Sequence, residues 1–370
     1  MTKAAELAKM GEVLTNSQIG GRRNIVINGA MQVAQRGTSF SLSGTADTFI
    51  TDRFLISNSD TGAWTASQST DSPTGFSNSL KMDCTTADTS PTFLTLMTRF
   101  EGQDLQHLKK GTSSAEKTTL SFFVKSNKTG TYIAELRDID NNRTIGKAYT
   151  ISSADTWEQK IITFDGDTTG AFGNDNGNSL QIIWYLAVGS VYNSGTLATS
   201  WGSRVNANTA VGQVNLADSS DNEWYITGIQ LEVGSQATPF EHRSFGEEQR
   251  LCQRYAIVYS KNGQPNMGQK AIGTGASTNS SGGYQAFIFP QVTMRAVPTL
   301  TVGGSVSDYE ILKYETGYVD VNSSISLFSA SGRSLFVLTF SSATAEAERG
   351  RDVIMRLEGD NSSLLFDSEL

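Results

Sequence analysis

The sequence predicts an all-β protein: a jelly-roll-like β-sandwich with a short N-terminal helix and a second, C-terminal β-domain. Three observations predict it. Short segments of alternating apolar residues recur at near-regular spacing between residues 24 and 243, and clusters of Asn, Asp, Gly, Ser and Thr separate them. Helical periodicity is almost absent within these limits. The length of 370 residues leaves room for two or three domains.

Charge and composition exclude two classes of partner. Lys and Arg total 29 against 37 Asp and Glu, which gives a net charge of -8 at pH 7 and a pI near 5.0. A nucleic-acid-binding face needs clustered basic residues, and here the densest basic runs are pairs. No apolar stretch approaches the roughly 20 residues of a membrane-spanning helix. We therefore expect neither nucleic-acid binding nor membrane insertion.

The N-terminal segment, residues 1–23, is predicted to be an attachment or oligomerisation helix followed by a polar linker. Leu7, Met10 and Leu14 repeat at spacings of three and four, which makes an apolar stripe along residues 2–15. A helix of about 12 to 15 residues is marginal alone, so the stripe needs a partner surface. We assign the attachment role to these three residues. The alternative is an ordinary helix packed on its own domain.

The first β-domain, residues 24–248, is predicted from strand signals with turn chemistry between them. Its ends are expected to be a short strand at residues 25–27, a second strand carrying Met31 and Val33, and a closing strand that begins at Tyr225. The first and last strands of a sandwich are expected to lie close together. Inner strands are expected at residues 92–100, 120–126, 130–136, 160–164 and 180–188.

A helix is predicted over residues 244–255, because Ser244 and Glu247 match a capping box. We expect it to join the sandwich to the second β-domain, residues 249–370. The alternative is a helix packed on the first domain.

The second β-domain is predicted from a further series of apolar segments. Residues 261–283 are rich in Gly, Ser and Asn and are predicted to be a long loop. The apolar tip at residues 364–366 needs a cover. Strands are expected at residues 284–289, 299–302, 309–314, 324–328, 335–340 and 352–357.

The sequence offers little for catalysis. His107 and His242 are the only histidines, and no G-x-S-x-G turn supplies a nucleophile. Cys84 and Cys252 are far apart and lack the spacing of a zinc site. A single disulfide is one option for them, and we favour two free, buried thiols. Closely spaced carboxylates, as in RDIDNN and FDGDTTG, lie in turns, where Asp is favoured for backbone reasons. An enzyme is not expected.

Residues 165–170 begin like a calcium-binding loop. Asp165 and Asp167 occupy the first and third positions of the ligand series, and Asp175 offers a further carboxylate nearby. The twelfth position is Asn176 rather than the bidentate glutamate. We weigh a structural calcium ion against a metal-free acidic turn and favour the turn. No other cofactor is expected.

Candidate sugar-binding residues are aromatic side chains in polar loops, because a sugar stacks its C–H face on an aromatic ring. Trp201 lies in such a loop with Arg204 close by, and Trp64 follows the turn-like DTGA. The predicted ligand-binding residues are therefore Trp201, Arg204 and Trp64. The alternative for Trp201 is a role in the core.

Two segments at the ends of the first β-domain resemble a module found repeatedly in bacteriophage tail-fibre and related virion proteins. The first begins at Asn24 and reads NIVINGAMQVAQRGTSF; the second ends at Arg243 and reads YITGIQLEVGSQATPFEHR. The family pattern opens with N-x-x-I-N-G-x-x-x-x-x-Q-R-G-T-S-F and T-A-D-R. It closes with G-x-x-Y-I-T-G-x-Q-L-E-x-G-x-x-A-T-P-F-E-x-R. Here residues 48–51 split the T-A-D-R element, whereas the closing half is nearly intact.

The resemblance covers roughly residues 24–256 and implies a jelly-roll, carbohydrate-binding-type sandwich on a virion. On this basis we expect a homotrimer that joins other virion proteins through its N-terminus and binds a host cell-surface glycan. A second hypothesis is a purely structural capsid-decoration, head-fibre or tail-knob protein, and a third is a glycan depolymerase. The N-terminal residues lack the apolar block of a signal peptide. We therefore expect synthesis in the host cytoplasm and a place on the exterior of the phage tail or capsid.

Overall fold

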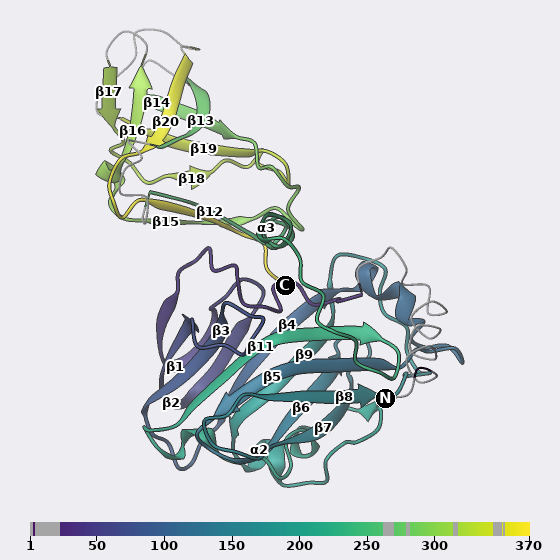
Figure 1. The fold of residues 1–370 in the computed structure, drawn as a ribbon. Helices are drawn as coiled ribbons and strands as arrows, with labels where there is room; N and C mark the ends of the chain where they lie inside the picture. Colours follow the sequence, from purple (N-terminus) through teal and green to yellow (C-terminus); the bar gives the residue numbers. More distant parts are fainter. Residues whose placement is uncertain are drawn as a thin grey trace. The chain divides into compact units, whose positions relative to one another are not determined.

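The computed structural model describes residues 3, 23–261, 270–278, 282–313, 317–342, 350 and 352–370 (Figure 1). The protein is nearly all β, with 47% of residues in strands and 9% in helices, which confirms the predicted fold class. The chain divides into two compact units, Met1–Glu248 with Leu370, and Gln249–Glu369. No helix in the described ranges is long and apolar enough to cross a membrane.

The first unit is an antiparallel sheet in which hydrogen-bonded neighbours follow the order β10-β7-β6-β9-β4-β2-β3-β11-β5-β8, with β1 paired to β2. Short helices fill some of the connections: α2 Ser190–Asn193, η1 Gly102–Leu108, η2 Asn206–Asn208 and η3 Leu216–Asp218. The strands are β1 Ser39–Phe49, β2 Leu55–Ser69, β3 Ser79–Thr86, β4 Phe93–Glu101, β5 Thr118–Ser126, β6 Gly130–Asp138, β7 Arg143–Ile151, β8 Glu158–Phe164, β9 Asn178–Val188, β10 Gly202–Ser203 and β11 Glu223–Val233.

Strand β2 is where this sheet passes from one layer to the other. Residues 55–59 pair with β4, and residues 63–69 pair with β3. Between them, Asp60 and Gly62 have φ angles of 48° and 63°, in the left-handed region that redirects a strand. We call β10, β7, β6, β9, β4 and the start of β2 the first layer. The end of β2 with β3, β11, β5 and β8 is the second layer.

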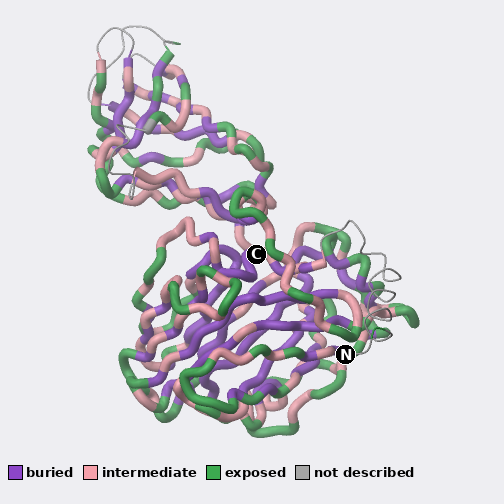
Figure 2. The backbone as a smooth tube through the Cα atoms, in the orientation of Figure 1, coloured by how far each residue is buried: buried purple, intermediate pink, exposed green. Residues whose placement is uncertain are grey.

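The core between the layers is built from large aromatic side chains. Trp64, Trp184 and Trp224 are each at most 1% exposed and belong to one apolar cluster. Burying an aromatic side chain of this size contributes several kcal/mol, so these three residues hold the layers together. Figure 2 shows the resulting buried stretches along the central strands.

Strand β9 is buried on both of its faces. Trp184 faces the core, whereas Ile183 and Tyr185 belong to a second apolar cluster on the opposite side of the sheet. That cluster includes Tyr192 and Leu197, from the connection between β9 and β10. Part of the outer face of the first layer, the face turned away from the core, is therefore covered by this connection.

Five inner strands expected from the sequence are confirmed as β4, β5, β6, β8 and β9. The sequence prediction omits β1, β2, β3 and β7. Most of β2 reads SNSDTGAWTASQS, and small polar residues of this kind favour turns when only local chemistry is considered. Pairing with strands on both sides overrides that local preference.

The opening segment lies beside β11 as expected, but the prediction of a strand at residues 25–27 is wrong. Its backbone contacts β11 through two hydrogen bonds, Ile25 N–H to the Leu231 carbonyl and Ile229 N–H to the Gly29 carbonyl, both 2.9 Å. The segment carrying Met31 and Val33 is not a strand either. Its left-handed turns, with φ of 60° at Asn28 and 55° at Met31, prevent a regular ladder.

The second unit holds two sheets over an apolar core of its own. One has the order β12-β21-β15, and the other β17-β16-β20-β13-β14-β19-β18. The strands are β12 Ala256–Ser260, β13 Lys270–Ser277, β14 Gly283–Ile288, β15 Thr299–Gly303, β16 Tyr309–Lys313, β17 Gly317–Asp320, β18 Ser326–Leu327, β19 Phe336–Ser341, β20 Asp352–Leu357 and β21 Ser363–Asp367, with η4 at Val306–Asp308.

The sequence predictions for the second unit hold in part. The predicted helix is α3 Phe245–Gln253, and Ser244 Oγ accepts a hydrogen bond from the Glu247 N–H at 3.3 Å. The predicted loop at residues 261–283 is wrong where it contains β13, a central strand of its sheet. The apolar tip is likewise a central strand, β21, whose Leu364 and Phe366 are fully buried.

Candidate binding site

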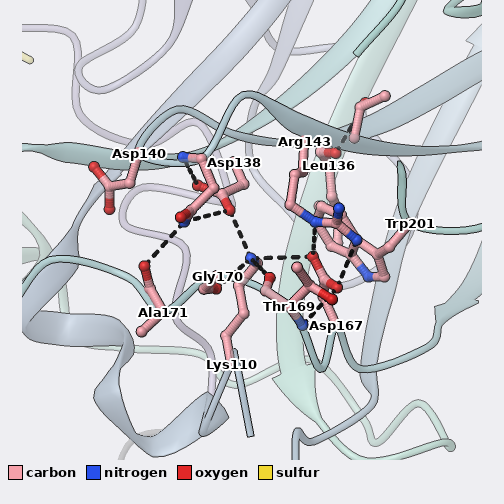
Figure 3. Close-up of polar contacts among 12 residues, drawn as sticks. Lys110, Leu136, Asp138, Asp140, Arg143, Asp167, Thr169, Gly170, Ala171 and Trp201 are labelled. Carbon is pink, nitrogen blue, oxygen red and sulfur yellow. Dashed lines mark hydrogen bonds and ion pairs between the residues drawn. The ribbon is translucent and has the colours of Figure 1, made fainter. Parts of the chain in front are cut away.

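A buried ion network surrounds Lys110, two residues beyond η1 (Figure 3). The Lys110 Nζ lies 2.6 Å from Asp138 Oδ2 and 3.1 Å from Asp167 Oδ2. It also donates hydrogen bonds to the carbonyl oxygens of Thr169, at 2.9 Å, and Gly170, at 2.7 Å. The ammonium is thus surrounded by oxygen acceptors, which offsets the cost of its burial.

Asp167 joins this network to strand β7. Arg143 binds its carboxylate with two parallel hydrogen bonds, Nε to Oδ2 at 2.7 Å and Nη2 to Oδ1 at 2.9 Å. Burial alone would raise the pKa of Asp167, but the hydrogen bonds from Arg143 and Lys110 outweigh burial and lower it. Two carboxylates and two cations therefore balance each other, and the network is complete without a ligand.

Trp201 lies at the rim of this network, as Figure 3 shows. Its indole N–H donates to the carbonyl of Asp165 at 2.7 Å, and its ring is half-buried against the core. The Lys110 Nζ lies 5.5 Å from the centroid of the Trp201 ring and 5.2 Å from that of Phe172. Lys110 therefore makes cation–π contacts with both aromatic rings, which fix their positions.

A cavity of about 400 Å³ opens beside Lys110. This volume lies within the range of roughly 300 to 1,000 Å³ typical of small-molecule sites. Its walls combine apolar groups with the Gln106 amide and the Lys109 ammonium, a mixture that suits a polar ligand with an apolar face, whereas the Lys110 ammonium is engaged by its network. The lining residues are Leu105, Gln106, Lys109, Lys110, Thr112, Ala171 and Phe172.

The network does not have the features of a glycosidase acid pair. Asp138 and Asp167 share one ammonium, so they lie close enough for the separation of about 5 to 5.5 Å that a retaining glycosidase uses. Both carboxylates are buried, however, and cations already engage them, so neither is free to act on a substrate. The general acid also needs a raised pKa, and that of Asp167 is lowered.

The three carboxylates considered as calcium ligands each have other partners. Asp165 is exposed and pairs with Lys117 at 2.8 Å, and Asp167 is held by Lys110 and Arg143. Asp175 Oδ1 accepts a hydrogen bond from the N–H of Gly177 at 2.8 Å, as in an Asx turn. These three carboxylates do not converge as a ligand set within the described part of the chain. The acidic residues serve the turns and ion pairs instead.

The prediction that Trp64 binds a ligand is wrong. Its side chain is 1% exposed, and its indole N–H donates to the Thr61 carbonyl at 2.8 Å. Side chains alternate along β2, and this alternation points Trp64 into the core. In the sequence the preceding DTGA resembles a turn, and a buried position was therefore not predicted. The residues assigned to virion attachment, Leu7, Met10 and Leu14, lie outside the described residues.

Trp201 and Arg204 do not form one site, contrary to the sequence prediction. Strand β10 lies between them and pairs Gly202 with Thr144. Side chains alternate between the faces of a strand, so residues three apart point to opposite sides. Trp201 consequently reaches Lys110, whereas the Arg204 side chain reaches the outer face of the first layer.

On that outer face Arg204 completes a second polar cluster. Glu135, fully buried on β6, accepts hydrogen bonds from the hydroxyls of Thr144 and Tyr185 and from Arg204 Nε at 3.2 Å. Arg204 Nη2 donates to the Tyr185 hydroxyl, also at 3.2 Å. Burial and the neighbouring Glu135 carboxylate raise the pKa of Tyr185, which keeps its phenol neutral.

The sequence prediction missed the polar residues that matter most on both sides of the first layer. On β6 the sequence A-E-L-R-D places Glu135 and Arg137 at alternate positions between apolar residues. Residues two apart on a strand lie on the same face, so this pattern indicates that the face of β6 opposite the core is polar. Lys110 carries no such signal, because its partners are distant in sequence.

In the described part of the second unit, the carboxylates of Glu310, Asp320 and Glu358 lie close together. Arg356 pairs with Glu310 and lies over the ring of Tyr318. Burial and a hydrogen bond from Glu358 raise the pKa of Glu310, while the neighbouring Arg356 acts in the opposite direction.

No protein-family model matches this chain. No curated protein matches it. Among solved structures, the chain is similar to the enzymatically active domain of a bacteriophage CBA120 tailspike protein, with 15% identity over 57% of this chain and 21% of that chain and a TM-score of 0.32. It is also similar to the family 11 carbohydrate-binding module of a Clostridium thermocellum cellulase, with 12% identity over 59% and 100% of the chains and a TM-score of 0.28.

A third similar structure is the C-terminal family 22 carbohydrate-binding module of a Clostridium thermocellum xylanase, with 10% identity over 50% and 89% of the chains and a TM-score of 0.29. At these identities and TM-scores the likenesses assign no residue and no activity to this protein.

Proposed function

We propose that this chain is a bacteriophage virion protein of the tail-fibre type, which attaches the particle to its host by binding a cell-surface glycan and catalyses no reaction. One observation carries the proposal. The two sequence segments that resemble phage tail-fibre proteins, about 200 residues apart in the chain, form a single hydrogen-bonded unit.

Asn24 is the centre of this unit. Its side chain accepts hydrogen bonds from the N–H groups of Val26 at 3.0 Å and Leu231 at 3.1 Å, and donates to the Ile229 carbonyl at 3.0 Å. Its backbone N–H donates to Glu241 at 2.6 Å. The Asn24 residue therefore joins the opening segment to both β11 and the P-F-E-H-R end of the closing motif.

Arg243 and Asn28 make the remaining hydrogen bonds between the opening segment and the residues that follow β11. Arg243 donates to the backbone carbonyls of Asn24 and Val26 and pairs with Glu248 at 3.2 Å. Glu248 accepts the Asn28 N–H at 2.6 Å, and the Asn28 side chain makes hydrogen bonds to Val33 and Asp52. Residues at matching motif positions have interlocking structural roles, which supports the resemblance as more than a coincidence of composition.

The closing motif is also tied together within itself. Glu232 accepts hydrogen bonds from the Thr238 N–H at 2.8 Å and from the amide of Gln230 at 2.9 Å. Gln230 Oε1 in turn accepts the N–H of Glu241 at 2.8 Å. Each of the motif residues Gln230, Glu232, Thr238 and Glu241 therefore fixes the path of the chain after β11.

Glycan binding without catalysis is supported by the surroundings of Lys110. The carboxylates near the cavity are already neutralised by cations, while the ring of Trp201, which contacts Lys110 but does not line the cavity, remains half-exposed. A half-exposed aromatic ring with amide and ammonium groups nearby is the arrangement that stacks a sugar ring and binds its hydroxyls.

The proposal includes assembly as a homotrimer on the virion exterior, with the N-terminal segment joined to other virion proteins after synthesis in the host cytoplasm. Several copies would multiply a weak glycan contact by avidity. Exposed apolar side chains in the second unit, Phe289 at 71% and Phe328 at 42%, favour a second candidate: a capsid-decoration, head-fibre or tail-knob protein that contacts only its neighbours.

Adsorption competition tests the proposal. Purified full-length protein is added to host cells, and phage adsorption is followed as the protein concentration rises. We expect saturable inhibition that Trp201→Ala weakens by about tenfold, because a lost stacking contact is worth about 1 to 1.5 kcal/mol. Trp157→Ala is the matched control, since Trp157 is also half-buried with its indole N–H bonded, to Asp71 at 3.0 Å. Folded trimer that never inhibits adsorption would favour the second candidate.

A further inference from the structure

A row of polar side chains crosses the outer face of the first layer beside the Glu135 cluster. The strand registers place Thr144 of β7 opposite Arg137 of β6, Arg137 opposite Gln181 of β9, and Gln181 opposite Arg99 of β4. Neighbouring strands are about 4.8 Å apart, so consecutive side chains in this row are within reach of a common ligand group.

Arg137 lacks an anionic partner in this row. Its guanidinium is half-buried, and its Nε is buried without a hydrogen-bond acceptor. Arg137 forms no ion pair with any residue of the described ranges. The nearest carboxylate, Glu135, is already engaged by Thr144, Tyr185 and Arg204.

Gln181 has a buried acceptor without a donor, just as Arg137 has a buried donor without an acceptor. Its side chain is 5% exposed, and its Oε1 is buried without a donor among the residues that the structure describes. Leaving a buried acceptor without a donor costs its full desolvation penalty. Two adjacent strands therefore place a cation without an anionic partner and an acceptor without a donor next to each other, on the same face of the sheet.

The local charge is positive. Arg137 and Arg204 stand beside a single carboxylate, Glu135, and burial together with the charge of Arg204 lowers the pKa of Arg137. An anion bound at this point would relieve both the repulsion and the desolvation. Arg99, at the far end of the row, already donates to the Leu370 carbonyl, and the proposed site does not include it.

We propose that Arg137 and Gln181 bind the anionic group of an acidic saccharide, with the guanidinium on a carboxylate or phosphate and the glutamine carbonyl on a neighbouring sugar hydroxyl. The planar guanidinium matches an oxyanion with two parallel hydrogen bonds. A chloride or sulfate ion would satisfy Arg137 but would offer Gln181 Oε1 no donor, whereas a sugar acid has hydroxyl donors beside its charge. The inference takes its ligand class from the proposed glycan-binding function.

Direct binding to full-length protein, measured by calorimetry, tests the inference. The probes are an oligogalacturonate, the same oligosaccharide as its neutral methyl ester, and an oligosaccharide bearing mannose 6-phosphate. We expect the acid to bind and the ester to bind at least about tenfold more weakly, because the ester cannot pair with Arg137. Binding of the phosphorylated probe in place of the acid identifies phosphate as the anion. Equal binding of acid and ester, or no binding of either acidic probe, would overturn the inference.

Two variants and a control locate the site. Arg137→Gln should weaken binding of the acidic probe by about tenfold or more. Gln181→Glu should abolish binding while leaving thermal stability unchanged or higher, because the new carboxylate pairs with Arg137 in place of the ligand. Arg250→Gln, an equal charge change at an exposed position on α3, should leave binding unchanged. If the Gln181→Glu variant stays folded and still binds the acid, the assignment is overturned, even if the Arg137→Gln variant does not fold.

The outcome separates this inference from the proposed function. Binding of an acidic oligosaccharide that depends on Arg137, from protein that does not inhibit phage adsorption, supports the site and contradicts host attachment. Inhibition of adsorption by a protein that binds no acidic probe supports attachment and overturns the site.

Discussion

At the scale of single residues, the buried charges around Lys110 form a set that balances. Lys110 is held by two carboxylates and two carbonyls, while the adjacent Lys109 pairs with Glu116 on the surface, where its side chain is 54% exposed. Two neighbouring lysines of one loop are therefore expected to contribute very differently to the free energy of unfolding. Their identical chemistry makes them a matched pair.

We predict that Lys110→Met lowers the free energy of unfolding of the first unit by about 3 to 5 kcal/mol, because it leaves Asp138 buried without its cation. Lys109→Met should change it by no more than about 0.5 kcal/mol. Urea unfolding followed by tryptophan fluorescence measures both, since all five tryptophans lie in the first unit. Equal effects of the two substitutions would contradict the structural role of Lys110.

At the scale of elements, strand β21 is the clearest case of a segment whose role depends on its neighbours. It pairs on one side with β12 and on the other with β15, and the ring of Phe366 stacks on Phe336 with centroids 4.2 Å apart. A segment near the chain end, which a sequence reading leaves as an uncovered apolar tip, is the central strand of its sheet.

We expect Phe366→Ala to destabilise the second unit by about 3 to 5 kcal/mol, the usual cost of deleting a buried aromatic side chain. Phe289→Ala removes the same atoms from a side chain that is 71% exposed and should cost less than about 0.5 kcal/mol. Thermal unfolding by circular dichroism compares the two variants. A small effect of Phe366→Ala would show that β21 does not support the core of this unit.

At the scale of the whole molecule, the two units respond to pH in opposite directions. In the first unit the pKa of Asp167 is lowered below its usual 3.8, because hydrogen bonds from Arg143 and Lys110 outweigh burial. A lowered folded-state pKa contributes stability above pH 3.8 that is lost as pH falls through the folded value. In the second unit, burial and Glu358 raise the pKa of Glu310 above its usual 4.5. That contribution is present below pH 4.5 and is lost as pH rises through the raised value.

We therefore predict that acidification below about pH 4 destabilises the first unit while the second unit is maintained. Tryptophan fluorescence reports the first unit alone, and calorimetry reports both. Glu310→Gln should flatten the pH dependence of the second unit above pH 4.5 and leave the fluorescence transition unchanged. Parallel loss of both transitions on acidification would contradict the opposed contributions.

The sequence by itself determined the all-β class, the approximate positions of many strands and the adjacency of the two motif segments. Each of these features depends on local alternation, turn residues or a recognisable motif, which a linear sequence records directly. Both cysteines, Cys84 and Cys252, are free and buried, as favoured from their apolar character. The half-exposed position of Trp201 was also within reach of sequence reasoning, because its loop is polar.

Only the tertiary structure decided which side of a strand each candidate residue occupies. Trp64 and Trp201 both follow polar residues, yet pairing on both sides of β2 turns Trp64 into the core. The separation of Trp201 from Arg204 depends on one pairing between β10 and β7. The partners of Lys110 and the neighbours of Arg137 lie on other strands, and register between distant strands is set by packing of the whole sandwich rather than by local sequence.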